Sequence, residues 1–182
     1  MTSRFEFLAR FATAGLLMLL TVASCDRVYA QDPATSPDHW APLRPMIGVW
    51  EGQRTGMGGD ANMEVEWKFV MGENFIRVSS KTIEGDDPHG DVGFISFDQA
   101  RQQFVYRAFF SEGFVNQYAG TMSDDGKSIE FESESVENGP PGLRAKEVIS
   151  LHEGGGMQTQ LHLASGDQPF KLCVTVDLTR QD

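Results

Sequence analysis

Residues 63–69 read Met63-Glu64-Val65-Glu66-Trp67-Lys68-Phe69, an unbroken alternation of apolar and charged side chains. Successive side chains of a β-strand point to opposite faces, so this pattern is typical of a strand with one buried face. The same alternation returns at Phe104, Tyr106, Ala108 and Phe110, at Ile129 and Phe131, and at Phe170, Leu172, Val174, Val176 and Leu178. No segment shows a helical period longer than two turns. The pattern therefore predicts an all-β protein.

Segments of this kind follow one another along the chain, separated by turn-forming Gly, Asn, Asp and Pro residues. Strands are predicted at residues 46–54, 61–71, 74–83, 91–97, 103–111, 114–122, 128–136, 143–152, 157–164 and 169–179. Short strands joined by tight turns favour a meander, and about ten strands are enough to close a sheet and remove its exposed edges. We therefore predict a single closed antiparallel β-barrel over residues 43–182. An open sandwich is the main alternative.

The first thirty residues differ from the rest of the chain in composition. Arg4 and Arg10 form a short basic start, and residues 11–24 then carry no charge. A basic segment followed by an apolar one is typical of a secretory signal, whereas a membrane-spanning helix needs about 20 apolar residues. We predict export to the periplasm or cell envelope. An uncleaved N-terminal anchor is the alternative.

Two cleavage routes are compatible with this signal. Val28-Tyr29-Ala30 has the small-residue spacing that signal peptidase reads, which makes residues 1–30 a signal peptide. Val22-Ala23-Ser24-Cys25 resembles the lipobox of bacterial lipoproteins, in which the cysteine is acylated and becomes the first residue. The lipobox is slightly favoured. Contact with a membrane is then expected only through the signal segment or through a lipid on Cys25.

Between the signal and the barrel, residues 31–42 contain three Pro and small polar residues, so they are predicted to form a flexible tether. The chain has two cysteines, Cys25 and Cys173. Either cleavage route leaves the folded domain with one thiol, so no intrachain disulfide is expected there. The barrel must therefore be held together by its core.

The chain is strongly acidic, with 15 basic and 26 acidic side chains. Residues 1–30 hold three of the basic and two of the acidic ones, which leaves 12 against 24 and a net charge of −12. Such a surface repels phosphate backbones and anionic lipid headgroups. We expect no nucleic-acid partner and no membrane binding through a basic patch. The oligomeric state is left open.

Motifs for catalysis and metal binding are scarce. The four histidines, His39, His89, His152 and His162, are scattered without the spacing of metal ligands. The sequence contains neither a G-x-S-x-G elbow nor a C-x-x-C pair. We therefore predict no catalytic residue and no metal site.

One acidic residue stands out from the solvated charges. Glu147 falls in phase with Leu143, Ala145, Ile149 and Leu151, which predicts that it points to the interior of the barrel. A bare buried charge is costly, so the carboxyl must be paired or its pKa must be raised. A structural pair with an arginine is the favoured explanation, ahead of acid–base chemistry.

Aromatic side chains come from most of the predicted strands. They are Trp50, Trp67, Phe69, Phe75, Phe94, Phe104, Tyr106, Phe109, Phe110, Phe114 and Tyr118. Packed inward, they either fill a small barrel or line a cavity, and a barrel of this strand number lies at that boundary. We predict a cavity lined by Trp50, Trp67, Tyr106, Phe110 and Tyr118. A filled core is an equal alternative.

The segment Ile47-Gly48-Val49-Trp50 resembles the G-x-W opening of the calycin barrels, which include lipocalins and fatty-acid-binding proteins. The resemblance implies that Trp50 closes one end of the barrel and that Gly48 permits a close backbone approach. Residues 109–118 and 133–142 look like an uncharacterised bacterial family of lipocalin-like barrels with no assigned activity. These likenesses imply a fold and leave the function open.

Two other segments resemble the nitrobindin-type heme-binding barrels. Residues 88–94 look like their P-x-H-x-E-x-G-Y/F stretch, with a shortened spacing before His89 and an Asp in place of the Glu, and residues 176–180 are similar to their ending. In those barrels a His five residues before the Leu of the terminal Leu-x-Arg binds ferric heme. Counting back from Leu178 gives Cys173, which makes this thiol a possible heme ligand. Its alternation, however, sets it opposite the apolar face, and no cofactor is expected.

Four hypotheses for the function follow from these observations. The leading one is a non-enzymatic barrel that binds a small, largely apolar molecule, with His89 joining the five aromatic residues at the site. The second is an envelope structural or interaction protein with a filled barrel. The third is a heme-binding barrel of the nitrobindin type. An enzyme that uses His89, Glu112 or Glu147 as a general base is the least favoured.

Overall fold

A computed structural model describes residues 38–83 and 90–182 of the chain. The predicted signal segment with Cys25, most of the predicted tether, and His89 lie outside the described residues. What the sequence indicates for them remains a prediction. In the described part of the chain, no helix has the length and apolar character needed to cross a membrane.

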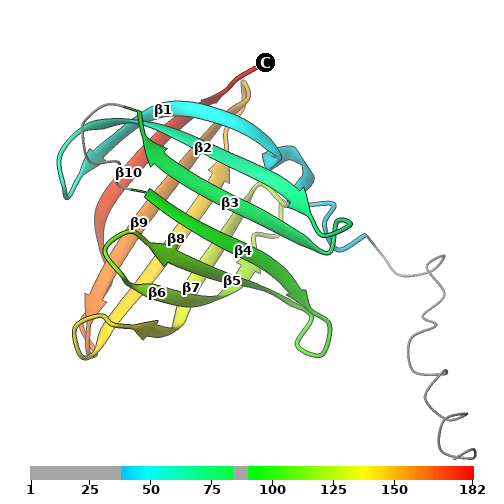
Figure 1. Ribbon diagram of the computed structural model, residues 1–182. Helices are drawn as coiled ribbons and strands as arrows, with labels where there is room; N and C mark the ends of the chain where they lie inside the picture. The colour runs from blue at the N-terminus through cyan, green and yellow to red at the C-terminus, as the bar shows by residue number, and fades with distance from the viewer. Residues whose placement is uncertain (1–37, 84–89) are drawn as a thin grey trace, which may run out of the picture. The chain divides into compact units, whose positions relative to one another are not determined.

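The described residues form ten β-strands and one short 3₁₀-helix, η1, over Arg44–Met46 (Figure 1). The strands are β1 (Gly48–Gly56), β2 (Ala61–Val70), β3 (Phe75–Thr82), β4 (Gly90–Asp98), β5 (Gln103–Phe110), β6 (Val115–Met122), β7 (Ser128–Glu137), β8 (Leu143–Leu151), β9 (Gly156–Ser165) and β10 (Lys171–Arg180). Their bounds lie within a few residues of the predicted ones. The all-β prediction is confirmed.

Each strand pairs in antiparallel fashion with the next one along the chain, and β1 pairs with β10 to close the sheet. The closing ladder runs from Trp50 opposite Arg180 to Gly56 opposite Val174. No edge is left within the strand order, because every strand has two partners. The closed meander barrel is therefore confirmed, and the open sandwich is wrong.

The chain packs against the barrel before the first strand begins. Trp40 is buried, and its ring lies 5.8 Å from that of Phe104 and 5.9 Å from that of Phe69. Leu43 and Met46 are fully buried in the same cluster. The packed unit thus begins at His39, inside the segment that composition assigns to a tether, because a single large aromatic side chain finds an apolar site on the barrel.

Trp50 closes the barrel end next to η1. Its indole N–H donates to the carbonyl oxygen of Met46 at 2.8 Å, and the Arg180 guanidinium lies over its ring at 4.6 Å. Arg180 also donates to the carbonyl oxygen of Pro45. Gly48, with φ of 143°, leaves room for this guanidinium, since a Cβ there would lie 3.3 Å from it. The geometry shows the role that the calycin resemblance implies for Trp50, whereas at Gly48 the close neighbour is the Arg180 side chain and not a second backbone segment.

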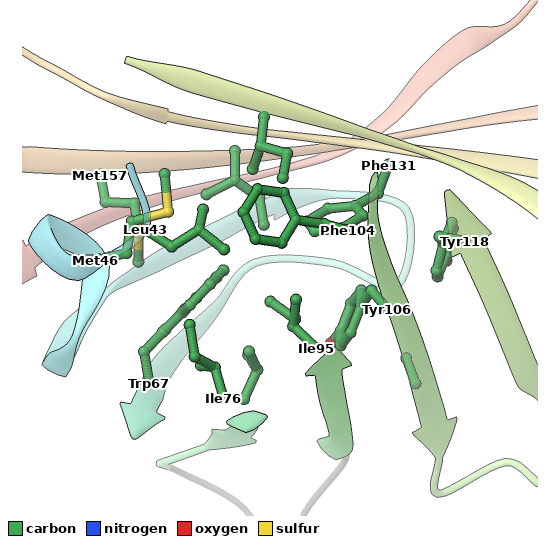
Figure 2. Close-up of a cluster of buried hydrophobic side chains, with 14 of the residues drawn as sticks. Leu43, Met46, Trp67, Ile76, Ile95, Phe104, Tyr106, Tyr118, Phe131 and Met157 are labelled. Carbon is green, nitrogen blue, oxygen red and sulfur yellow. The ribbon is translucent and has the colours of Figure 1, made fainter. Parts of the chain in front are cut away.

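This half of the barrel is filled with side chains. Figure 2 shows Leu43, Met46 and Met157 grouped at one side of the core, with Phe104 and Phe131 between them and the tyrosines Tyr106 and Tyr118. All of these residues are buried, together with Ile76, Ile95, Ile129 and Ile149. The filled-core expectation therefore holds for the end that Trp50 closes.

The start of β10 departs from the predicted alternation. The register with β9 shifts between Leu172 and Val174, so Cys173 is an extra residue in a β-bulge. Leu172 is consequently 52% exposed, whereas Val174 faces the interior. Phe170 lies beneath the cations of Arg144 and Lys146 on the outer face. The single apolar face predicted from Phe170 to Leu178 is wrong before the bulge.

The closing contact of Arg180 gives a test of the fold. We expect Arg180→Ala to lower the free energy of unfolding by about 1–2 kcal/mol, because it removes a cation–π contact and a charged hydrogen bond to a backbone carbonyl. Urea titration measures this. Arg107→Ala is the matched control, since its ion pair with Glu137 is exposed and should contribute less than about 1 kcal/mol. Equal losses for the two variants would contradict the closing role.

Candidate ligand-binding cavity

The other half of the barrel is hollow. A cavity of about 450 Å³ lies among the ends of the strands, where Arg54 of β1, Phe110 of β5, Val136 of β7 and Leu143 of β8 line it. The fully buried side chains of Trp67 and Tyr118 belong both to its wall and to the core cluster, so they separate it from the filled half. The exposed residues Met57 and Glu112 also line it, and the cavity therefore reaches the surface.

Most of the wall is apolar. Aliphatic side chains from six strands contribute to it, including Val65, Val78, Ile149, Leu161, Leu163 and Val176. They alternate with outward-facing residues along each strand, so the wall follows directly from the period of the β-structure. A cavity of this volume with an apolar wall and a few convergent polar groups is the usual form of a small-molecule site.

The structure brings together three of the five aromatic residues predicted to line a cavity. Trp67, Phe110 and Tyr118 line it. Trp50 does not, because its indole is held at the closed end by Met46 and Arg180. Tyr106 is buried one layer behind the wall, between the rings of Tyr118 and Phe131. Whether the three residues contact a ligand remains a prediction.

His89, the sixth predicted site residue, lies outside the described residues, although the next residue, Gly90, lines the cavity.

Asp91 is an interior carboxyl at the start of β4. It accepts hydrogen bonds from the Ser80 hydroxyl and, at 3.5 Å, from the Tyr106 hydroxyl. Burial raises the pKa of Asp91 above its ordinary value; the two hydrogen bonds lower it in part, and the charge of Glu112 adds to the rise. The hydrogen bond from Tyr106 holds the Asp91 carboxyl in place, so this tyrosine supports the site without lining the cavity.

Glu147 of β8 is the second interior carboxyl, as its phase in the sequence predicts. It lines the cavity opposite Leu161 and Phe131 of the neighbouring strands. Burial, and to a lesser degree the charge of Asp91, raises its pKa to about 8. No side chain of the described residues forms a hydrogen bond or ion pair with it. The expected pair with an arginine is therefore wrong, and the raised pKa is the alternative that applies.

Asn116 and Tyr118 of β6 complete the polar part of the wall. The Asn116 amide Nδ2 donates to the Tyr118 hydroxyl at 2.6 Å. The Asn116 Oδ1 is buried and has no hydrogen-bond partner in the described part of the chain. Burial raises the pKa of Tyr118, so its hydroxyl stays protonated. An orphaned buried acceptor in the wall of a cavity indicates a donor that the protein itself does not supply.

Sequence reasoning missed Asp91 and Asn116 as site residues, although the signal was present. Asp91 lies in phase with the interior residues Gly93 and Ile95, and Asn116 lies in phase with Tyr118. These are the same phase relations that identified Glu147. Polar residues at apolar positions of a strand could therefore have revealed all three.

The cavity contains one basic side chain among its described lining residues. Arg54 lies at the surface end, where its guanidinium donates to the carbonyl oxygens of Gly58 and Gly59 at 3.2 and 3.3 Å. The described residues contain no group of three His, Cys, Asp or Glu side chains that could hold a metal ion. The site is thus acidic in its depth and basic only at its mouth.

Cys173 is not part of the cavity wall. It is the bulged residue of β10, and its Sγ donates to the carbonyl oxygen of Lys171 at 3.3 Å. Its neighbours Val174 and Val176 line the cavity instead. The position that corresponds to the heme-binding histidine in the nitrobindin-type resemblance therefore holds a thiol that is not among the lining residues of the cavity.

Comparison with known proteins identifies the family. The profile of the THAP4-like, heme-binding beta-barrel domain matches residues 39–180. The chain belongs to this family. The match covers all but the last two residues of the packed unit, from the residue before Trp40 to Arg180 at the end of β10. The resemblance to nitrobindin-type heme-binding barrels, read from residues 88–94 and 176–180, is confirmed.

One solved structure agrees with this assignment at the level of the fold. The chain is similar to Rv2717c from M. tuberculosis, with 20% identity, a TM-score of 0.60, and coverage of 81% of this chain and 100% of that one. A redesigned beta barrel is more remote, with 12% identity, a TM-score of 0.39, and coverage of 81% and 100%. No curated protein matches the chain.

Members of this THAP4-like family are described as heme-binding, so the described residues must be tested against a heme. Protein ligands to heme iron are His, Cys, Met or Tyr side chains. The described cavity wall offers no His and no Cys; the Tyr118 hydroxyl accepts from Asn116 and stays protonated, Met57 is exposed at the surface end, and the thioether of Met63 is a ligand type that acts beside a His. The interior also carries two carboxyls. These residues do not fit an iron-ligated heme.

The raised pKa of Glu147 makes the stability of the barrel depend on pH. The folded protein keeps this proton up to about pH 8, whereas the unfolded chain loses it near the ordinary value of 4.5. The folded state therefore binds more protons within this window, and stability falls as pH rises through it. Asp91, whose pKa is also raised, acts in the same direction.

We expect Glu147→Gln to stabilise the protein at pH 8 by on the order of 2 kcal/mol, a value reduced for the access of water to the cavity, and to change little at pH 4.5. Urea unfolding across this range measures the effect. Glu132→Gln, at an exposed position of β7, is the control and should leave the pH profile unchanged. A wild-type profile that is flat from pH 4.5 to 8 would contradict the buried carboxyl.

Proposed function

We propose that this protein is an exported, non-enzymatic binding barrel that holds a small, largely apolar molecule in its cavity. The observation that carries the proposal is the half-hollow interior, in which about 450 Å³ of space is walled mainly by aliphatic and aromatic side chains. Membership of a family described as heme-binding supports a ligand-binding role for the barrel. A barrel that served only as a scaffold would have no need of such a space.

Two alternatives are less well supported. A filled barrel that acts through its surface is consistent only with the closed end, because the other half of the barrel holds the cavity. An enzyme would need two acid–base groups within hydrogen-bond reach of each other. Glu112 and Glu147 both line the cavity, yet Glu147 forms no side-chain hydrogen bond with a described residue. The hydrogen bonds of Asp91 to Ser80 and Tyr106 hold it in the wall.

Heme is a second candidate ligand, which family membership favours. In this chain it would be held by the apolar wall, without a His or Cys ligand from the described lining residues. The sequence led us to expect no cofactor, whereas the family is named for heme binding. Identification of the bound molecule separates the two.

Filling the cavity should abolish binding. Leu161→Trp places an indole in the hollow opposite Glu147, so we expect the affinity for the neutral apolar probe N-phenyl-1-naphthylamine to fall at least about tenfold. Probe fluorescence measures this. Val49→Trp on the outer face, at a side chain that is 36% exposed, is the control and should bind as the wild type does. Failure of the wild-type protein to bind any apolar probe would contradict the proposal.

The export route and the natural ligand can be read from one preparation. We expect native mass spectrometry of the protein purified from the envelope of its host to show a bound small molecule, and the intact mass to show either a chain that starts at Gln31 or an acylated Cys25. A Soret band in the purified protein would establish heme in place of the proposed ligand, and its loss in Cys173→Ala would identify the thiol as the iron ligand. A mature chain that retains residues 1–30 would contradict cleavage of the signal.

A further inference from the structure

We propose that the molecule held in this cavity is an apolar amine bound as its ammonium ion, with Asp91, Asn116 and Glu147 as the groups that receive its N–H donors. This inference rests on the proposed function, because it names the chemistry of the ligand that the barrel binds. It follows from the polar groups of the wall and from the single basic side chain, Arg54, among its described lining residues.

The three acceptors come from β4, β6 and β8 and line the same cavity. Asp91 and Asn116 are linked through the stacked rings of Tyr106 and Tyr118, whose centroids lie 5.7 Å apart. Tyr106 donates to Asp91, and Asn116 donates to Tyr118. The carboxylate of Asp91 is near enough to Glu147 to raise its pKa. The acceptors therefore face a common space within an otherwise apolar wall.

Asn116 supplies the observation that is independent of the acids. Its side chain is only 8% exposed and lines the cavity, and its Oδ1 has no partner among the described residues. Buried acceptors in native proteins nearly always receive a hydrogen bond. The donor must then come from a bound molecule or from water held in the cavity, and a ligand N–H satisfies the requirement directly.

Charge decides which donor fits. Among the described residues the two interior carboxyls have no positive partner: the one basic lining residue, Arg54, is directed to the carbonyls of Gly58 and Gly59. An anionic ligand would be repelled by either carboxyl in its ionised form, and a neutral ligand would stabilise neither ionised form. An ammonium ion compensates them and satisfies Asn116 with the same N–H groups. Its hydrocarbon part then fills the aliphatic wall.

The proton balance is consistent with this pairing. An aliphatic amine has a pKa of about 10.4, well above the value of about 8 at Glu147, so the proton resides on the amine and Glu147 becomes a carboxylate when the two meet. The other titratable or charged groups that face Glu147 or its surroundings are Asp91, Tyr106, Tyr118, Glu112 and Arg54. Both tyrosines stay protonated because burial raises the pKa of each. Binding at pH 7 should therefore release close to one proton.

The test uses three probes with the same alkyl chain: octylammonium, 1-octanol and octanoate. We expect octylammonium to bind at least about tenfold more tightly than octanol, and octanoate to bind most weakly, by calorimetry at pH 7. Repeating the titration in buffers of different ionisation enthalpy measures the released proton. The affinity for octylammonium should rise between pH 6 and pH 9, as Glu147 loses its proton.

Variants separate the charge effect from the shape of the cavity. Glu147→Gln should weaken octylammonium at least about tenfold, abolish the proton release, and leave octanol unchanged. Asp91→Asn should weaken octylammonium in the same direction, which guards against a failure of one variant to fold. Glu132→Gln on the outer face is the matched control and should bind all three probes as the wild type does.

The outcomes distinguish this inference from the proposed function. If octanol or octanoate binds as tightly as octylammonium, or if Glu147→Gln has no effect on the preference, the ammonium inference is wrong while the binding barrel stands. If none of the three probes binds the wild-type protein, the binding function itself fails and the inference fails with it.

Discussion

The pairing of β1 with β10 is the constraint on which the rest of this structure depends. It places Arg180, the last residue of the last strand, directly opposite Trp50 of the first. The indole then bonds the carbonyl of Met46 and lies beneath the guanidinium, which fixes η1 as a cap over that end. With one end closed, any molecule that enters the barrel must enter from the other end, where the loops after β1 and β5 contribute to the cavity wall.

The closed register also decides what the interior contains. Once the sheet is closed, each inward-facing side chain must lie inside the barrel, whether it is apolar or polar. Near the cap these residues are large and fill the space, whereas toward the other end aliphatic residues leave a hollow that holds Asp91, Asn116 and Glu147. Carboxyls in such a place reduce the stability of an empty barrel, and this is typical of residues retained for a site.

Membership of the THAP4-like, heme-binding family favours heme as the ligand, whereas the described wall of this cavity offers no His or Cys to bind its iron. The fold is shared along the whole domain, but the position that the nitrobindin-type resemblance assigns to an iron ligand is Cys173, which a bulge removes from the wall. A barrel can keep its strands and its cap while the residues of its cavity change, because the contacts of Trp50, Met46 and Arg180 that form the cap lie at the other end. The ligand must therefore be argued from the cavity of this chain.

The sequence by itself determined the strands, their antiparallel order and the inward position of Glu147, because these depend on a local period of two residues that needs no partner to be visible. It also indicated the cap through Gly48 and Trp50. Only the tertiary structure decided that Trp50 and Tyr106 support the interior without lining the cavity, that Leu172 is exposed just before a bulge, and that no cation of the described residues meets Glu147. Those facts depend on pairings between strands far apart in the chain and on the space left between side chains. No local pattern records either of these.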